Sequence, residues 1–254
     1  MHAEHNTQEV ALIVGGGPGT SASCARLFHA NGMSVAIAAR NPDKPVLQTL
    51  KEQCGAHLYR CDASDPNDVA SLFETVTREL GAPQLVVHNI DGRTMEIFRK
   101  DITEADPALV LQTIQNSAFS AFLVGQQAAK SMLARPMPEN KHRGTIIFTN
   151  ASAAMKGYPR SAAFAIACHG KAGLAQSMGR ELMPQGIHIA QVPIDGAIGW
   201  EREDGERAHN IAGKDDNDNL LHPDSIAETY LYIHRQHCST WTCEVVLRPW
   251  VENW

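Results

Sequence analysis

The sequence lacks the features that would point to a membrane or to a nucleic acid. No uninterrupted apolar run approaches the roughly 18 residues that cross a bilayer. The first ten residues contain no basic stretch followed by an apolar core, as a secretion signal would. The net charge of −6 and the pI near 6.0 give no general attraction to nucleic acid. We therefore expect a cytoplasmic protein whose partner is a small molecule.

The sequence also lacks paired metal-binding motifs. His234, His237, Cys238 and Cys243 are residue types that bind zinc, but no second CxxC or HxxxH pair accompanies them. The six cysteines are spread along the chain rather than gathered into the compact framework of a small secreted domain. We predict free thiols and no metal site.

Short apolar segments alternate with segments of helical periodicity along the whole chain. The length of 254 residues, with 43% hydrophobic and 20% charged residues, fits one globular domain over residues 1–254. Because the strands are continuously apolar, the alternation predicts a Rossmann-type, doubly wound α/β fold. We expect a mostly parallel seven-stranded sheet with helices on both faces and strands at 9–15, 33–39, 56–59, 84–89, 144–149, 187–192 and 242–247.

The predicted helices cover residues 20–31, 45–54, 66–80, 106–133, 159–183 and 222–235. The two longest could form a dimer face, so we expect a homodimer or a homotetramer. Residues 196–221 are rich in Glu, Asp, Asn and Gly and show no apolar periodicity. This stretch is either a solvated loop or a lid over a ligand crevice, because it leaves the carboxyl end of a strand.

A glycine-rich turn, ValGlyGlyGlyProGlyThrSer at 14–21, links the first predicted strand to the first predicted helix. Glycines let the backbone turn tightly and approach a pyrophosphate, whose charge is stabilised by free amides at the helix N-terminus. A glycine-rich turn alone is weak evidence, but its position between a strand and a helix favours a nucleotide site.

From about residue 10 to residue 250 the chain resembles the short-chain dehydrogenase/reductase family. Gly15-x3-Gly19-x-Ser21 is similar to the family's glycine motif, with Ser21 at its third glycine. Cys61-Asp62-Ala63 resembles its adenine-contacting Asp site, and HisAsnIleAsp at 88–91 resembles its AsnAsnAlaGly segment. The resemblance implies a dinucleotide site, for which we predict Gly15, Gly17, Gly19, Thr20, Arg40, Asn41, Asp62, Ala63, Asn89, Ile90 and Thr149.

The end of the second predicted strand indicates which nicotinamide cofactor binds. An acidic residue there would accept hydrogen bonds from the adenine ribose, whereas an arginine can pair with a 2′-phosphate. The sequence reads Ala38-Ala39-Arg40-Asn41, with no carboxylate. We therefore predict NADP(H), the alternative being that Arg40 only covers the end of the sheet.

The resemblance also locates the reaction site, which the family builds from a Ser, a Tyr and a Lys. The segments at 144–152, 157–159 and 175–189 match the family without a gap, which places Ala151, Phe164 and Cys168 at those three positions. Alanine has no hydroxyl, phenylalanine has no proton to give, and cysteine has no cationic head. The family's usual proton relay is therefore not expected to operate here.

Three neighbouring side chains are considered as replacements. Ser152 lies one residue past the serine position and has even odds of lining the pocket, because strand alternation can lapse where a strand ends. Tyr158 precedes Phe164 in a loop, where a substrate contact is favoured over an acid. Lys171 shares a helical face with Phe164, but lies farther along the axis than the family's lysine and is expected at a helix surface or a subunit contact.

Three functions remain open at this stage. The first is an NADP(H)-dependent oxidoreductase that acts on a small, apolar carbonyl or alcohol substrate through a non-standard proton relay. The second is a non-redox enzyme, such as a lyase, isomerase or cyclase, that uses the same crevice. The third is a catalytically inactive NADP-binding protein.

Overall fold

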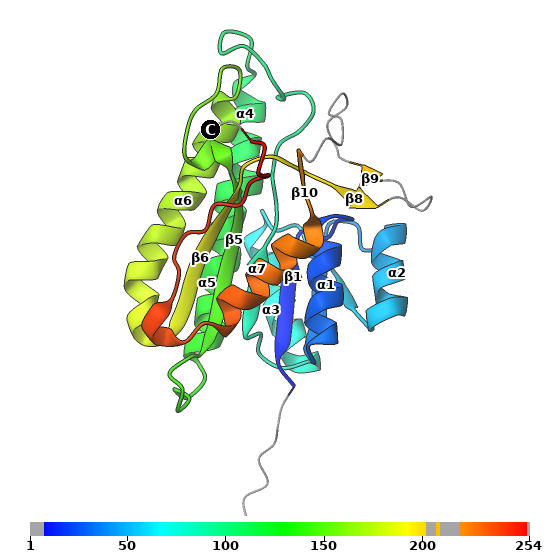
Figure 1. Ribbon diagram of the computed structural model, residues 1–254, viewed down its shortest axis with the longest axis vertical. Coiled ribbons are helices and arrows are strands. Elements are labelled where there is room, and N and C mark those ends of the chain that lie inside the picture. Colours follow the sequence, from blue (N-terminus) through cyan, green and yellow to red (C-terminus); the bar gives the residue numbers. More distant parts are fainter. Residues whose placement is uncertain (1–7, 202–206, 209–218, 253–254) are drawn as a thin grey trace, which may run out of the picture.

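The computed structural model describes residues 8–201, 207–208 and 219–252, which form a parallel sheet covered by helices (Figure 1). The strands of the sheet are β1 (Val10–Val14), β2 (Ser34–Ala39), β3 (His57–Arg60), β4 (Leu85–His88), β5 (Gly144–Ala151) and β6 (Ile187–Ile194). The helices are α1 (Thr20–Ala30), α2 (Pro45–Cys54), α3 (Pro66–Glu79), α4 (Pro107–Ile114), α5 (Ser120–Leu133), α6 (Ala162–Leu182) and α7 (Pro223–Arg235).

The six strands pair in the order β3-β2-β1-β4-β5-β6, and every pair is parallel. One apolar core packs α1, α2 and α7 on one face of the sheet, where α7 lies beside α1 (Figure 1). A second core packs α3, α5 and α6 on the other face. The doubly wound α/β architecture is confirmed. Because the strand order reverses between β1 and β4, the ligand crevice is expected at the carboxyl ends of these two strands.

The sheet has six strands rather than seven, because residues 242–247 run beside β6 without forming a continuous ladder. Two isolated parallel bridges join Gln191 to Glu244 and Ile194 to Leu247. The backbone of Gln191 exchanges hydrogen bonds with residues 243 and 245, and the carbonyl of Pro193 accepts one from Leu247. Pro193 has no N–H to donate in return, so the ladder is interrupted at its middle.

The predicted lid at 196–221 lies largely outside the described residues. Its described ends form two small pairs: β7 (Ala197–Ile198) is parallel to β10 (Leu220–Leu221), and β8 (Trp200–Glu201) is antiparallel to β9 (Arg207–Ala208). The first pair sits directly after β6, at the carboxyl end of the sheet. The lid therefore stays a prediction, although its base borders the crevice.

A continuous helical segment over 107–133 joins α4, a π-helical turn at 115–119 and α5. By length and composition it is apolar enough to span a membrane, with a mean hydropathy of 1.2, and 39% of that window is buried inside the protein. The core helix of a globular protein meets the same criteria, so this is weak evidence for a span. Its exposed face carries several large apolar side chains, namely Leu111, Phe119, Phe122 and Leu133.

Candidate active site

Two adjoining cavities lie at the carboxyl ends of the central strands. The first, the β2-side cavity, has a volume of about 490 Å³ and lies beside the ends of β1, β2 and β3. The second, the α6-side cavity, has a volume of about 480 Å³ and lies between β4, β5 and α6. Asn89, Ile90, Asp91 and Arg93 line both. The structure brings every predicted cofactor residue into one or the other: Gly15, Gly17, Gly19, Thr20, Arg40, Asn41, Asp62, Ala63, Asn89, Ile90 and Thr149.

The turn after β1 requires glycine at its first position. Gly15 has a φ of 108°, and a Cβ there would lie 2.3 Å from the carbonyl oxygen of Asn89. Both the positive φ and the close approach exclude a side chain. At Gly17, by contrast, a Cβ would meet nothing within 4 Å, so this position faces open space in the β2-side cavity.

Ser21, which replaces the family's third glycine, is part of the turn rather than an obstruction. Its side chain is buried, and its hydroxyl donates to the Gly15 carbonyl oxygen at 2.5 Å. The Ser21 hydroxyl oxygen in turn accepts a hydrogen bond from the side-chain amide of Asn89 at 2.7 Å. Ser21 therefore ties the glycine turn to the end of β4.

The N-terminus of α1 presents polar groups that no described protein group satisfies. Its N-cap is Gly19, which offers no side-chain cap to the first amides of the helix. The Thr20 hydroxyl oxygen is buried, lines the α6-side cavity and has no hydrogen-bond partner among the described residues. Free amides and an orphaned hydroxyl at a helix N-terminus suit an anionic ligand such as a pyrophosphate.

The far wall of the β2-side cavity carries two basic side chains. Arg40 directly follows β2, and Lys44, which sequence reasoning did not single out, lines the same cavity and donates to the Gly16 carbonyl at 3.4 Å. The Asp62 carboxylate accepts two hydrogen bonds from Ser64, which lower its pKa, and the nearby Arg40 acts in the same direction. This wall can therefore receive a phosphate beside Arg40 while Asp62 stays ionised.

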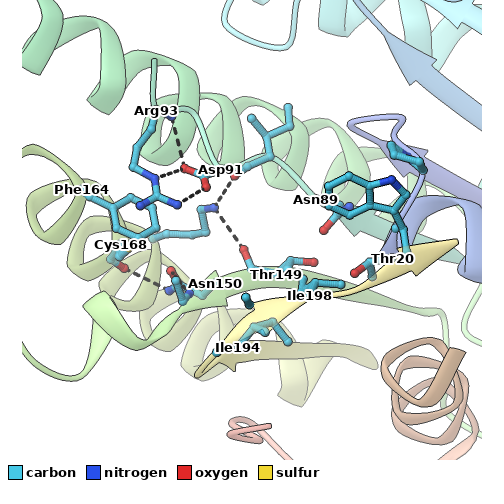
Figure 2. A pocket seen from close by; sticks show the side chains of 18 residues that line it. Thr20, Asn89, Asp91, Arg93, Thr149, Asn150, Phe164, Cys168, Ile194 and Ile198 are labelled. Atoms are coloured by element: carbon cyan, nitrogen blue, oxygen red, sulfur yellow. Dashed lines mark hydrogen bonds and ion pairs between the residues drawn. The ribbon is translucent and has the colours of Figure 1, made fainter. Parts of the chain in front are cut away.

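The three positions that the sequence resemblance aligns with the family's Ser, Tyr and Lys all line the α6-side cavity. Ala151 lies at the end of β5, and Phe164 and Cys168 lie on α6 (Figure 2). Burial raises the pKa of the Cys168 thiol to about 11, so this side chain is a small apolar group and not a nucleophile. Ala151 and Phe164 have no acidic proton, and the thiol of Cys168 is only a weak acid and a weak hydrogen-bond donor.

An ion pair that sequence reasoning missed covers the ring of Phe164. Arg93 donates two hydrogen bonds to the Asp91 carboxylate, at 2.7 Å and 2.6 Å, and its guanidinium carbon lies 3.6 Å from the ring centroid of Phe164 (Figure 2). The charge of Asp91, which stands in place of a family glycine, is thus balanced by Arg93. This bidentate, stacked geometry depends on a planar guanidinium.

Lys171 does not lie at a helix surface or a subunit contact, as the sequence suggested. It is 2% exposed and lines the α6-side cavity, with its Nζ donating to the Ile90 carbonyl at 2.9 Å and the Thr149 carbonyl at 3.1 Å. Burial lowers the pKa of this ammonium to about 8. Helical periodicity gave its face correctly but could not show that its long side chain reaches the ends of β4 and β5.

Ser152 and Tyr158 line a third cavity rather than the α6-side cavity. This cavity has a volume of about 450 Å³ and shares Arg93 and Phe164 with its neighbour. Ser152 begins a short 3-10 turn after β5, and Tyr158 is 42% exposed. The catalytic role of Ser152 and Tyr158 stays a prediction. These two residues line the third cavity, Lys171 lines the α6-side cavity, and Phe164 lines both.

Comparison with known proteins agrees with this arrangement. A family model described as enoyl-(acyl carrier protein) reductase matches residues 18–247. The chain belongs to the short-chain dehydrogenase/reductase family. Members of this family are oxidoreductases that bind NAD or NADP, act on small molecules and often form oligomers.

Individual relatives are similar over most of the chain. It is 26% identical to (+)-borneol dehydrogenase 1 of Salvia officinalis over 91% of this chain and 88% of that protein. A match to tropinone reductase-like 1 of Erythroxylum coca, at 27% identity, covers 71% of this chain and 64% of that protein.

Solved structures share the fold over nearly the whole chain. A short-chain dehydrogenase from Rhodopseudomonas palustris superimposes with a TM-score of 0.75 at 26% identity, over 95% of this chain and 99% of that one. A metagenomic short-chain oxidoreductase in complex with NADP gives a TM-score of 0.75 at 22% identity, over 95% and 97% of the two chains.

Proposed function

We propose that this protein is an NADP(H)-dependent oxidoreductase that interconverts a carbonyl and an alcohol group on a small substrate with an apolar body. One observation carries the proposal: a cavity with a glycine turn and Arg40 adjoins a cavity that holds the buried ammonium of Lys171. The β2-side cavity can hold the nucleotide, and the α6-side cavity combines a proton donor with apolar side chains. Sequence features alone support the cytoplasm as the site of this activity.

The residues present fit NADP(H). The turn from Gly17 to Thr20 would hold the pyrophosphate, because Gly19 caps α1 without a side-chain hydrogen bond and the buried Thr20 hydroxyl has no partner among the described residues. Arg40 and Lys44 would pair with the 2′-phosphate. The relative that binds NADP supports this choice. When bound, the cofactor supplies or accepts the hydride. We assign the remaining contacts to Asn41, Asp62, Ala63, Asn89, Ile90 and Thr149.

We assign the proton to Lys171, since the position of the usual tyrosine holds Phe164. An ammonium has three N–H donors, and the Ile90 and Thr149 carbonyls occupy two of them. The third can donate to a substrate oxygen in the α6-side cavity. A pKa of about 8 suits a general acid that works near neutral pH. Ser152 and Tyr158 would then contact the substrate from the neighbouring cavity.

The apolar residues that line the α6-side cavity favour a substrate with an apolar body. Phe164, Ile194, Ile198 and Trp200 line the α6-side cavity together with the small Ala151 and Ala197. A pocket of this kind binds by apolar contact and is oriented by a few polar groups. The wide, partly apolar cavity therefore fits an aliphatic or alicyclic carbonyl better than a sugar.

The experiment is hydride transfer to a panel of ketones and aldehydes from NADPH deuterated at its transferable position, read by mass spectrometry of the products. Stereospecific deuterium transfer is expected. Lys171→Met should lower kcat by about 100-fold or more, while the NADPH Kd changes less than threefold. Lys130→Met, on an exposed position of α5, is the matched control and should change neither.

The pH profile gives a second readout for Lys171. Reduction needs the protonated ammonium, so kcat for reduction should fall as the pH rises through about 8. Loss of this limb in Lys171→Met would support the assignment, and an unchanged limb would remove it. Ser152→Ala and Tyr158→Phe test the other two candidates in the same assay. If either abolishes the limb, that residue is the acid instead.

Two other functions are also compatible with Phe164, which has no proton to donate to a substrate. A non-redox enzyme would convert a substrate without deuterium transfer, and an inactive NADP-binding protein would bind NADPH and convert nothing. The buried ammonium of Lys171 favours the oxidoreductase, because the Ile90 and Thr149 carbonyls leave its third N–H to donate to a substrate oxygen.

We also propose a homodimer or homotetramer. Exposed apolar side chains on α4, α5 and α6 support it, since they would otherwise face water: Leu111, Phe119, Phe122 and Ile166. Phe119→Glu with Phe122→Glu should shift the mass measured by light scattering toward the monomer. An unchanged mass would show that subunits associate elsewhere or not at all.

A further inference from the structure

The third cavity, here called the basic cavity, extends beyond Ser152 and Tyr158, the two residues through which the proposed reaction uses it. It is lined by residues 97–100 of the loop after β4 and by residues 158–164 at the start of α6. Arg93 and Phe164 line both this cavity and the α6-side cavity. A molecule whose reactive group lies near Lys171 could therefore extend past Phe164 into this second space.

The charge of its lining has one sign. Arg93, Arg99, Lys100 and Arg160 line the basic cavity, and no carboxylate is among its lining residues in the described part of the chain. Arg93 is already neutralised by Asp91 at 2.6 Å. Three basic side chains therefore supply the net positive charge.

Only one of these three has a carboxylate partner in the described part of the chain, and that partner is weakly held. Arg160 lies 3.9 Å from Asp101, and the side chains of both are more than half exposed. Exposed pairs of this kind contribute about 0–1 kcal/mol, so an incoming anion can replace Asp101. The guanidinium of Arg99 lies 5.2 Å from the ring centroid of Phe98, which orients it without neutralising its charge.

The backbone at two of these positions is held in an unfavourable conformation. Among the described residues, Arg99 (φ 55°) and Arg160 (φ 58°) are two of the three non-glycine residues with positive φ. The left-handed region costs a non-glycine residue about 1–2 kcal/mol. Arg99 and Arg160 are therefore held at this cavity in a backbone conformation that non-glycine residues disfavour. Residues in such conformations are concentrated at ligand-binding sites.

The rest of the lining combines hydroxyl groups with apolar surface. Ser152, Tyr158 and Ser161 offer hydroxyls, and Ile97, Phe98 and Ala163 offer apolar contact. Such a wall suits a ligand with an apolar chain that ends in an anionic group able to accept several hydrogen bonds.

We propose that the basic cavity binds a carboxylate or phosphate group of the substrate, whose carbonyl group lies in the α6-side cavity. This inference rests on the proposed function and narrows its substrate class. The substrate has an apolar body with a negative charge at the end remote from the reacting carbon. Arg99, Lys100 and Arg160 recognise that charge, and the stacked Arg93 and Phe164 separate it from Lys171.

The test is a binding measurement that does not depend on turnover. Saturated methyl-ketone carboxylic acids of increasing chain length, their methyl esters and the matching ketone phosphates are titrated by calorimetry into the full chain with and without NADPH. At low salt the best anion should bind at least tenfold more tightly than its ester. Raising the ionic strength to about 0.5 M should reduce that advantage, because it screens partly exposed charges.

Three variants locate the binding site. Arg99→Gln, Lys100→Gln and Arg160→Gln should each weaken anion binding about threefold to tenfold and leave ester binding unchanged. Arg180→Gln is the matched control, because this exposed arginine lies on α6 outside the cavity. A carboxylate-specific or phosphate-specific advantage tells the two anion sources apart.

Three results would overturn the inference: equal affinity for acid and ester, an equal loss in Arg180→Gln, or no binding by any member of the series. The proposed function fails in a different way. If the anions bind as expected but NADPH transfers no hydride to them, the anion site stands and the oxidoreductase assignment falls.

Discussion

The nucleotide side of the crevice is formed mainly by backbone groups, whereas the reaction side is formed by side chains. On the nucleotide side, the contacts come mainly from backbone: the turn at Gly15, the first amides of α1 and the carbonyls that close the ends of β1 and β4. On the reaction side, the contacts come from side chains of α6 and its neighbours, namely Phe164, Cys168 and Lys171. The first keeps the family's pattern, whereas the second departs from it.

This difference follows from what each side does for the fold. Gly15 lies so close to Asn89 that a side chain at this position would force the turn or the end of β4 to shift, and Ser21 joins the same two segments. Cys168 is buried and Ala151 is half-buried, and both present small side chains to the α6-side cavity. We therefore expect substitution to be tolerated less at Gly15 than at Ala151 or Cys168.

The largest expected effect is on folding, from Gly15→Ala. Its Cβ would lie 2.3 Å from the Asn89 carbonyl oxygen at a φ of 108°, so we expect a loss of about 3 kcal/mol in the free energy of unfolding. Urea denaturation measures it. Gly17→Ala is the matched control and should weaken NADPH binding while leaving the stability within about 0.5 kcal/mol. Equal losses of stability in Gly15→Ala and Gly17→Ala would contradict the structural role given to Gly15.

The next effect is on cofactor choice, from Arg40→Ala. Loss of the pairing with the 2′-phosphate should weaken NADPH by about 100-fold, or about 2.7 kcal/mol, and NADH by less than threefold. Fluorescence titration of both nucleotides measures the two constants. Arg78→Ala, at an exposed position of α3, should change neither. Equal weakening of NADPH and NADH would contradict the role given to Arg40.

A smaller effect concerns acid stability far from the crevice. Burial lowers the pKa of His142 to about 4, where it faces His188, His234 and Glu9. The folded state therefore resists a proton that the unfolded chain accepts below its ordinary pKa of 6.5. This contribution is complete above pH 6.5 and is lost as the pH falls toward 4.

Thermal unfolding between these two pH values tests the contribution of His142. We expect a loss of about 1–2 kcal/mol, discounted for partial exposure, and a shallower pH slope in His142→Gln. NADPH binding per folded molecule should be unaffected at either pH. A slope that His142→Gln leaves unchanged would assign the acid sensitivity to the other groups of the cluster or to His88.

The smallest expected effect concerns the stacking of Arg93 on Phe164 on the reaction side. Phe164→Leu removes the ring on which Arg93 stacks at 3.6 Å, and should lower stability by about 1 kcal/mol. Because Arg93 keeps Asp91, NADPH affinity should stay within threefold. Urea denaturation and titration of the same samples measure both. Tyr232→Leu, at an exposed position of α7, is the control and should lower stability less.

The fold was largely predictable because its signals are local. The continuously apolar strands and the periodic helices gave the correct order of elements, and the helix predicted from residue 66 begins at Pro66, with Asp65 as its N-cap. The seventh strand failed because its partner contains Pro193, whose missing N–H interrupts the ladder. Pairing across sequence depends on both strands, so the apolar run at 242–247 could not show this.

The site was predictable only where the chain itself forms it. The glycine turn and Arg40 belong to short segments, and the structure brings all the predicted cofactor residues to the two cavities. Arg93 stacks on Phe164 from a distant loop, a contact that no spacing rule indicates. Lys171 was assigned to the outside because periodicity describes a helix face and not how far a long side chain reaches.

We expect the nucleotide side to bind NADP(H) even though the reaction side departs from the family's pattern. Titration of the full, unmodified chain with NADPH and with NADH, followed by nicotinamide fluorescence, measures this binding. Saturable binding of NADPH at micromolar concentrations is expected, with binding of NADH at least tenfold weaker. No saturable binding of NADPH, or a preference for NADH, would contradict it.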